Sequence, residues 1–515
     1  NNITLQTLFP DTCYSKDSGG RPDVITDLSY EEFLEYHRTH YHPSNSYIYL
    51  YGNMDMDEKL EFLDREYLSK YDAIEVDTEI KSQPQAGKVK EVTGTFSVTE
   101  GDTDTKSYLS YNVLCGNILD KELYLAMQML DYALLSSSGA PLKQALIDAG
   151  IGSDVYGSYL NIKQPVYSII AKDADEKDKD RFVKIIKDTL RELADNGIDK
   201  NSLLAGINYF EFKYREADFG QFPKGLMYGI QAFDSWLYDD EKPFIHIEAL
   251  DTFEFLKAQV GTGYYEGLIQ KYLLDNTHGA IVLIKPEKGR TARMDKELQE
   301  KLQAYKESLT EEEKKELVER SIALEEYQSA PDAVEDLEKI PVLSREDISR
   351  DIEPIINEEM KIADVPVIFH EIETNGIGYM DVLFDMSGVE EADLPYVGIL
   401  QGVLGIIDTE NYKYGELFNE INVHTGGIGT SLELYTDISK VPEKEFKATF
   451  EIKGKALYQK LPVVFAMMKE ILTRSKFEDT KRVKEILAMQ KSRLLMKFQS
   501  SGHTTAVLRA MSYAS

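Results

Sequence analysis

Two spacings of apolar residues alternate along the chain, and they predict its secondary structure. Apolar positions three and four residues apart indicate helices at residues 121–135 and Lys179–Asn196, and Gly197 can end the second of these. Short, largely apolar runs at Ser107–Leu114 and residues 166–171 indicate strands. Strands joined by hairpins and interleaved with helices predict an α+β fold.

The same order of elements returns later in the chain. A strand is predicted at residues 378–385, a helix at 394–407, a strand at 448–452 and a helix at 461–473, with Pro462 in the first turn of that helix. Self-similarity over such a distance indicates an internal repeat. We therefore expect homologous units, each an antiparallel sheet with helices on one side.

A shorter device also occurs twice. Ser29 and Glu32 form a capping-box pattern that opens a helix, and residues 47–51 follow it as a predicted buried strand. A helix from Tyr265 and a strand at residues 280–284 repeat this order. Both copies resemble the end of one repeated unit.

The repeat predicts the domain organisation and an incomplete chain. Residues 1–75 hold only the closing part of a first unit, and the apolar helix at residues 504–511 is not followed by a closing strand. We therefore expect the chain to be cut at both ends. The expected parts are the end of the first unit at 1–75, a linker at 76–95, a second unit at 96–288, a helical hairpin and tether at 289–350, and a truncated third unit at 351–515.

The connector is predicted from a change in composition. Residues 292–320 are rich in Lys, Glu, Leu and Gln, and Thr310 with Glu313 can open a second helix there. A helical hairpin is the favoured interpretation. A coiled-coil partner site is the alternative, but the apolar positions cover too few heptads to favour it.

Composition and charge exclude several classes of function. No run of 18 apolar residues exists, so a membrane span is excluded, and residues 1–9 show no signal peptide. The net charge of −32 argues against a nucleic-acid partner. The two cysteines, Cys13 and Cys115, match neither a disulfide framework nor a metal site, which favours a reducing, cytoplasmic location.

Histidines near the start of the chain are the strongest metal candidates, and they are weak. His37 and His40 lie three residues apart on one predicted helical face, with His42 and Glu35 nearby. The run ends in His-Pro and has no general base in the spacing of a zinc peptidase, so a helix end is the favoured interpretation. The other His and Glu pairs are isolated, at His246 with Glu248 and His370 with Glu371.

Two glycine-containing runs resemble nucleotide-binding loops only superficially. Residues 136–139 lack the glycine spacing and the lysine of a phosphate loop. Residues 427–429 lack the acidic residue and the βαβ context of a dinucleotide fingerprint. No Ser or Cys stands in a recognisable nucleophile elbow.

Several motifs, in one order along essentially the whole chain, resemble zinc peptidases of the pitrilysin and insulinase family, and among them the presequence proteases. The resemblance implies four homologous α+β domains joined by a helical hairpin, which enclose short unstructured peptides that zinc-dependent hydrolysis then cuts. The motifs lie at residues 4–20, 28–33, 41–45, 140–146, 149–152, 326–332, 340–344 and 425–429.

The resemblance also implies that this chain lacks the catalytic residues. The zinc motif of the family, H-x-x-E-H, occurs nowhere in the sequence, and the family order places it before Asn1. We therefore assign no catalytic and no metal residue, and expect zinc in the full-length protein but none on this chain. The corresponding helix positions of the later units carry residues that cannot bind zinc, namely Leu125, Ala126, Met127, Tyr396, Val397 and Gly398.

Partners and alternatives follow from the same resemblance. The expected partners are peptide substrates and the missing N- and C-terminal parts of the same protein. Family members add extended peptides to a sheet edge, and residues 153–161 are a candidate edge, although an ordinary core hairpin is favoured there. The alternative functions are a non-catalytic relative that binds peptides without cleaving them and, less favoured, a structural scaffold.

Overall fold

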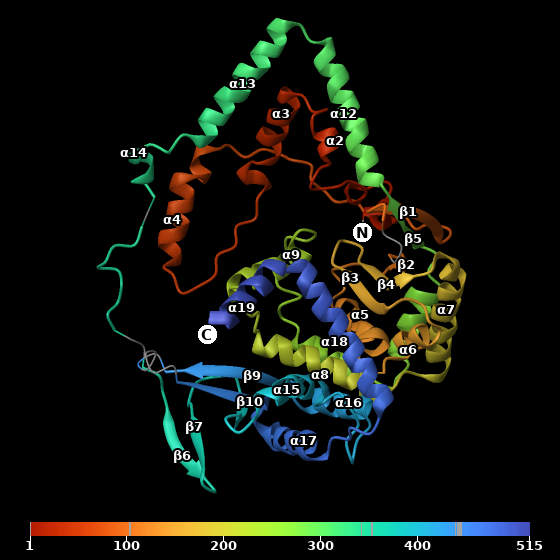
Figure 1. Ribbon diagram of the computed structural model, residues 1–515. Helices are drawn as coiled ribbons and strands as arrows, with labels where there is room; N and C mark the ends of the chain where they lie inside the picture. Colours follow the sequence, from red (N-terminus) through yellow and green to blue (C-terminus); the bar gives the residue numbers. More distant parts are fainter. Residues whose placement is uncertain are drawn as a thin grey trace. The chain divides into compact units, whose positions relative to one another are not determined.

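The computed structural model describes residues 2–101, 105–137, 139–340, 342–351, 354–437, 439 and 445–514. The chain divides into two compact units (Figure 1). The larger unit consists of residues 1–94, 106–285 and 374–515, and the smaller of residues 95–105 and 286–373.

The main sheet has five strands, in the order β1-β5-β2-β4-β3. Strand β2 (Ser107–Leu114) pairs antiparallel with both β4 (Val166–Ala174) and β5 (Gly279–Lys288), and β3 (Asp154–Leu160) pairs antiparallel with β4. Strand β1 (Lys90–Val98) begins within the stretch expected to be a linker. The antiparallel pairing confirms the α+β class.

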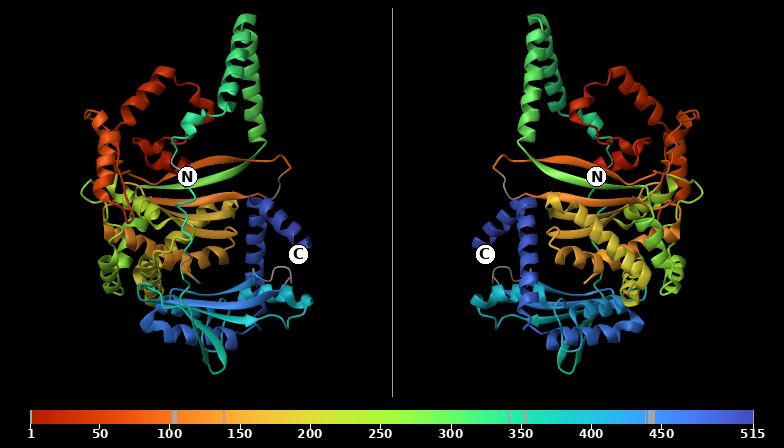
Figure 2. Two further views of the ribbon diagram at one scale, coloured as in Figure 1. Left: turned by 90° about the vertical axis from the view of Figure 1, so that its left-hand side faces the viewer. Right: turned by 90° about the vertical axis from the view of Figure 1, so that its right-hand side faces the viewer.

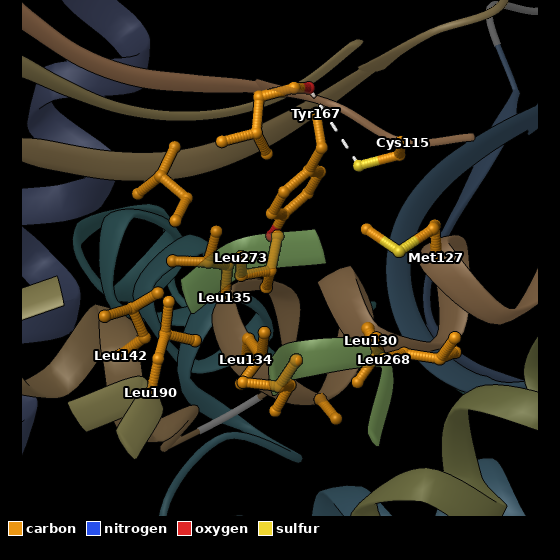
Figure 3. Close-up of a cluster of buried hydrophobic side chains, with 14 of the residues drawn as sticks. Cys115, Met127, Leu130, Leu134, Leu135, Leu142, Tyr167, Leu190, Leu268 and Leu273 are labelled. Atoms are coloured by element: carbon orange, nitrogen blue, oxygen red, sulfur yellow. Dashed lines mark hydrogen bonds between the residues drawn. The ribbon is translucent and has the colours of Figure 1, made fainter. Parts of the chain in front are cut away.

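Helices cover one face of this sheet (Figure 2). The core beneath it is formed by alternate strand residues such as Tyr111 and Tyr167 and by apolar helix positions such as Leu134, as the period-two and period-3.6 patterns predict. Figure 3 shows the ring of Tyr167 among these side chains. The helices are α5 (Lys121–Asp131), α6 (Pro141–Asp148), α7 (Lys179–Asn196), α8 (Lys200–Glu216) and α10 (Leu250–Ala258).

Two helices end in a π-helical turn. The predicted helix at 121–135 is α5 followed by the π turn Tyr132–Ser136, and α11 (Tyr264–Leu268) is followed by the π turn Ile269–Leu274. In the first, the amide of Ser137 donates to the carbonyl of Tyr132, five residues back, at 2.8 Å. The prediction of a helix is confirmed, and its wider last turn was not foreseen.

Helix α1 (Asn2–Leu8) covers part of the opposite face of the sheet. Leu8 and Phe9 are buried against Leu114, Val166 and neighbouring residues of β5. The imidazole of His278 donates from Nε2 to the carbonyl of Leu8 at 2.8 Å. The N-terminal residues are therefore anchored on the five-stranded sheet of the second repeated unit.

The prediction of a buried strand at residues 47–51 is wrong. Helix α3 (Tyr30–His40) forms as predicted, with both hydrogen bonds of the capping box, but residues 47–51 form no strand. They lie extended along helix α9 (Lys224–Trp236), and a Cβ at Gly225 would stand 2.2 Å from Cδ1 of Tyr51. The alternate apolar side chains need a surface to pack on, and here a helix with small residues supplies it in place of a neighbouring strand.

Most of residues 22–79 are exposed. Helix α2 (Pro22–Ile25), α3 and α4 (Met56–Glu66) contain no buried residue. Large apolar side chains on them face water, with Tyr30 70% and Phe33 61% exposed. Such a surface is typical of a segment that packs against further residues.

A second, three-stranded antiparallel sheet belongs to the third repeated unit. Its order is β8-β10-β9, formed by β8 (Ile377–Asp385), β10 (Phe446–Leu457) and β9 (Ile428–Thr436). Helices α16 (Tyr414–His424) and α17 (Leu461–Arg474) pack on one face of it (Figure 2).

Three further helices belong to this part of the chain. Helix α15 (Leu394–Val403) ends before the predicted 407, because Leu404 leaves the helical region with ψ of 137° and Gly405 then turns the chain with φ of 82°. The chain closes with α18 (Thr480–Ser500) and α19 (Gly502–Ala514). The helix expected at residues 504–511 is thus confirmed.

The smaller unit contains the predicted helical hairpin. Helices α12 (Arg290–Ser308) and α13 (Glu311–Ser329) form it, and Thr310 closes the capping box with Glu313. The tether after it contains the short helix α14 (Val334–Leu337). A hairpin of β6 (Glu358–Ile362) and β7 (Val365–Phe369) follows.

Candidate peptide-binding edge

Strand β3 lies at the edge of the five-stranded sheet. It pairs with β4 on one side, through a register that joins Asp154 to Lys172 and Leu160 to Val166. No strand of the described part of the chain pairs with its other side. An edge strand offers unpaired backbone N–H and C=O groups to an extended peptide. The candidate edge expected at residues 153–161 is therefore an edge in the structure.

The side chains beside this edge leave part of the sheet open. Tyr156 and Leu160 point away from the helices and are 40% and 38% exposed. Tyr156 stands next to Ile170 of β4, and Ser158 next to Ser168. Helix α1 covers the sheet farther along, where Val166 and its neighbours are buried. The open patch thus mixes apolar and hydroxyl side chains, which suits contact with varied peptides.

A half-buried carboxylate lies under the edge strand. Oδ1 of Asp131 accepts a hydrogen bond from the hydroxyl of Tyr167 at 3.1 Å, and Oδ2 accepts one from Ser136 at 3.0 Å. A Cβ at Gly157 would stand 1.5 Å from Oδ1, so only glycine leaves room for this carboxylate. Burial raises the pKa of Asp131.

The turn before β3 depends on two glycines. Gly150 and Gly152 have φ of 71° and 78°, and a Cβ at Gly152 would lie 2.7 Å from the carbonyl oxygen of Lys172. The hydroxyl of Ser153 donates to Oδ2 of Asp173 at 2.6 Å, which holds the turn against the end of β4. The motif at residues 149–152 therefore positions the start of the edge strand.

The histidines near the start of the chain are not brought together as metal ligands. The ring of His37 stacks on Tyr41 and that of His40 on Tyr36, with Nδ1 of His40 donating to the carbonyl of Tyr36. Nδ1 of His42 accepts from the amide of Ser44. These rings take part in local helix-end contacts.

The side chains that the structure describes are not arranged to hold a zinc ion. Within the residues that the structure describes, no three His, Cys, Asp or Glu side chains are arranged to hold a metal. The free thiol of Cys115 is buried, and burial raises its pKa to about 12, which disfavours the thiolate that binds metals. No step of a reaction is therefore assigned to a metal on this chain.

Sequence analysis missed a buried polar cluster behind the edge. The hydroxyl of Tyr124 and the amide of Asn161 both donate to Oδ2 of Asp234, at 3.1 and 2.9 Å. The ring of His246 stacks on Tyr124 at 3.9 Å, and both of its nitrogens lack a partner among the described side chains. Burial lowers the pKa of His246 to about 4. The residues of this polar cluster lie far apart in the chain, so no spacing in the sequence indicated the cluster.

Two family models match different parts of the chain. Residues 27–209 match the peptidase M16 inactive domain, and residues 284–515 match the domain associated with M16 peptidases of subfamily C. The chain belongs to the M16 peptidase family. The M16 inactive-domain match includes the edge strand β3 and the turn before it.

Curated M16 relatives extend over nearly all of the chain. Protein HypA of Clostridium perfringens is 41% identical over 99% of this chain and 52% of its own length. Presequence protease 1 of Arabidopsis thaliana is 30% identical over 98% of this chain and 47% of its own length. The chain thus spans about half the length of these relatives. The similarity to presequence proteases predicted from the motifs is confirmed.

A solved structure is also similar to the chain. The crystal structure of pitrilysin matches with a TM-score of 0.45 and 14% identity, over 97% of this chain and 50% of that one.

Among the described helices, none combines the length and apolar character needed to cross a membrane.

Proposed function

We propose that this chain is the peptide-holding, non-catalytic part of a zinc-dependent endopeptidase that degrades short unstructured peptides in an enclosed chamber. The observation that carries the proposal is the free edge of β3 beside an open sheet face, in a domain of the M16 family. Zinc and its ligands belong to the remainder of a longer protein, because relatives are about twice as long and no zinc motif occurs here. We propose that the protein is located in the cytoplasm.

On this proposal, a substrate adds to β3 as a further strand. Backbone hydrogen bonds supply most of the affinity and tolerate varied sequences, while alternate side chains of the peptide contact Tyr156 and Leu160. Most backbone of a folded protein is already paired within its own elements, which would favour unstructured peptides as substrates.

The test is the binding of a labelled twelve-residue unstructured peptide, followed by fluorescence anisotropy. Two variants of the peptide are compared, each N-methylated at alternate backbone amides. Methylation of the amides that face β3 should weaken binding at least tenfold, and methylation of the amides on the other side should weaken it little. Each lost hydrogen bond is worth about 1 kcal/mol, so three lost bonds exceed a tenfold change. Equal loss from both methylated peptides would contradict addition to a strand edge.

A second candidate function is peptide binding without cleavage by the complete protein. It is favoured by the inactive-domain match of residues 27–209 and by the poor fit of the chain to zinc. If the longer protein cleaves peptides and a chelator abolishes that cleavage, the endopeptidase is favoured. Binding without any cleavage would favour the non-catalytic relative.

A further inference from the structure

A small cavity lies away from the edge strand, between helices α8 and α16 of the larger unit. It has a volume of about 40 Å³. A cavity needs roughly 10–15 Å³ to hold one water molecule, so this one has room for a group of about three heavy atoms. Its walls are formed by Asn208, Glu211, Phe212, Arg215, Val423, His424, Thr425, Leu457 and Lys460.

Cations outnumber anions around this cavity. The single carboxylate among the lining residues, Glu211, already accepts from Arg215 at 2.7 and 2.9 Å and from Lys257 at 2.6 Å. Lys460 adds a further positive charge, and no carboxylate of the described residues lies within ion-pair distance of it. Lys257 also pairs with Glu254 at 2.9 Å, so the excess around the cavity is one positive charge, that of Lys460. Desolvation and the nearby Lys257 lower the pKa of Lys460, while Glu211 raises it. In a chain of net charge −32, a partly buried ammonium without a paired carboxylate favours an anionic ligand.

Several hydrogen-bond donors around the cavity keep unused capacity. Nζ of Lys460 donates to the carbonyl of Val423 at 3.1 Å and lies 3.4 Å from Nδ1 of His424, so it keeps donor capacity. Nη1 of Arg215 and the amide of Asn208 have no acceptor among the described residues. Donors from three side chains around a cavity of this size, with the one lining carboxylate already paired, fit an anion.

We propose that this cavity binds a carboxylate group. The guanidinium of Arg215 and the ammonium of Lys460 would pair with its two oxygens, and the Asn208 amide would donate to one of them. The cavity accommodates a carboxylate but not a whole amino acid, so the rest of the ligand extends outward. The carboxylate belongs either to a free small acid or to the end of a peptide.

Bound there, a carboxylate would join two repeated units. Arg215 and Asn208 belong to α8 of the second unit, while Lys460 precedes α17 and His424 ends α16 of the third. Another contact already joins α8 to the third repeated unit, since Lys455 of β10 pairs with Glu216 of α8 at 2.7 and 2.8 Å. The ligand would strengthen this junction by offsetting the repulsion among the cations.

The test uses sodium acetate as the probe and saturation-transfer NMR on the 515-residue chain. Acetate should bind with a millimolar dissociation constant, and Lys460→Gln should weaken it about tenfold, because a charged hydrogen bond is worth about 1.5 kcal/mol or more. Lys271→Gln removes an exposed charge of the same sign elsewhere and should change nothing. Lys460→Arg should keep binding, and Asn208→Ala should weaken it less than Lys460→Gln.

A tripeptide with a free C-terminus and the same peptide as its amide distinguish the two sources. Binding of the acid alone, lost in Lys460→Gln, assigns the carboxylate to a peptide end, whereas binding of acetate but of neither tripeptide assigns it to a free acid. No transfer to acetate, or equal loss in Lys460→Gln and Lys271→Gln, would overturn the proposal. The N-methylated peptides that test β3 do not enter this experiment, so the two proposals can fail separately.

Discussion

The ring of Phe212 on α8 fills the space beside Gly426, in the turn that leads from α16 to β9. A Cβ at position 426 would lie 2.2 Å from Cε1 and 2.3 Å from Cζ of that ring. Phe212 is 8% exposed and has little freedom to move. Gly426 of the motif at residues 425–429 thus allows α8 to pack closely against the turn that follows α16.

Gly426→Ala should therefore weaken the junction between α8 and α16. Overpacking costs about 1–3 kcal/mol, whereas Gly429→Ala, where a Cβ meets nothing within 4 Å, should change stability by less than about 0.5 kcal/mol. Hydrogen exchange of residues 417–427 measures the difference. If both variants exchange like the parent chain, the close approach is not present in solution.

His246 should make the second unit sensitive to acid. Its pKa is lowered to about 4 by burial, against about 6.5 when unfolded, so the unfolded state binds the proton first. The stability is fully present above pH 6.5 and is lost as the pH falls toward 4. The loss amounts to about 2 kcal/mol at pH 5.

The matched variant for this effect is His246→Phe, which keeps a ring on Tyr124 but cannot titrate. Urea unfolding at pH 7.5 and pH 5 should show a smaller acid loss for His246→Phe than for the parent chain. The exposed His37→Phe should behave like the parent. An acid loss that is identical in all three proteins would show that another group is responsible.

Asp131→Asn should stabilise the second unit at neutral pH. Burial raises the pKa of this carboxyl, so its contribution is unfavourable above the ordinary carboxyl range and disappears as the pH falls below it. The amide of Asn can still bond to the hydroxyls of Tyr167 and Ser136. The urea midpoint of Asp131→Asn should therefore lie above that of the parent chain at pH 7, and the two midpoints should coincide at pH 3. A lower midpoint for Asp131→Asn at pH 7 would show that the charge itself is needed.

The exposed apolar surface of residues 22–79 should drive association. Burying it is worth about 25 cal/mol per Å², and Tyr30, Phe33 and Leu34 are 70%, 61% and 46% exposed. Sedimentation should show self-association, or binding of an added segment that corresponds to the N-terminal part of the longer relatives, and Phe33→Ser with Leu34→Ser should reduce it. Tyr327→Ser, at an exposed site in the smaller unit, is the control. A clean monomer that ignores both a hydrophobic dye and the added segment would contradict the prediction.

The chain should hold no stoichiometric zinc at neutral pH and should not cleave peptides alone. A catalytic zinc site needs three protein ligands, and His37 and His40 offer at most two. Metal analysis after dialysis against micromolar zinc checks this. One tightly held zinc per chain, lost in His37→Ala with His40→Ala, would contradict it.

The sequence predicted elements whose signals are local. The capping box of Ser29 and the C-terminal Gly197 of α7 depend on a few neighbouring residues, and both appear as expected. The prediction of a strand at residues 47–51 is wrong, because the apolar pattern shows which side chains need burial but not whether a neighbouring strand or helix α9 covers them. The cluster of Tyr124, Asp234 and His246 and the cavity beside Lys460 depend on tertiary contacts alone.

The π turn after α5 makes the length of the chain there matter more than its composition. In an ordinary helix, residues five apart point in different directions, but the wider turn brings the hydroxyl of Ser136 back to the carboxylate of Asp131. Inserting or deleting one residue between them would rotate the hydroxyl away and leave the carboxylate with Tyr167 alone. The buried residues 132–135 can thus exchange for other apolar residues of similar size, while their number cannot vary.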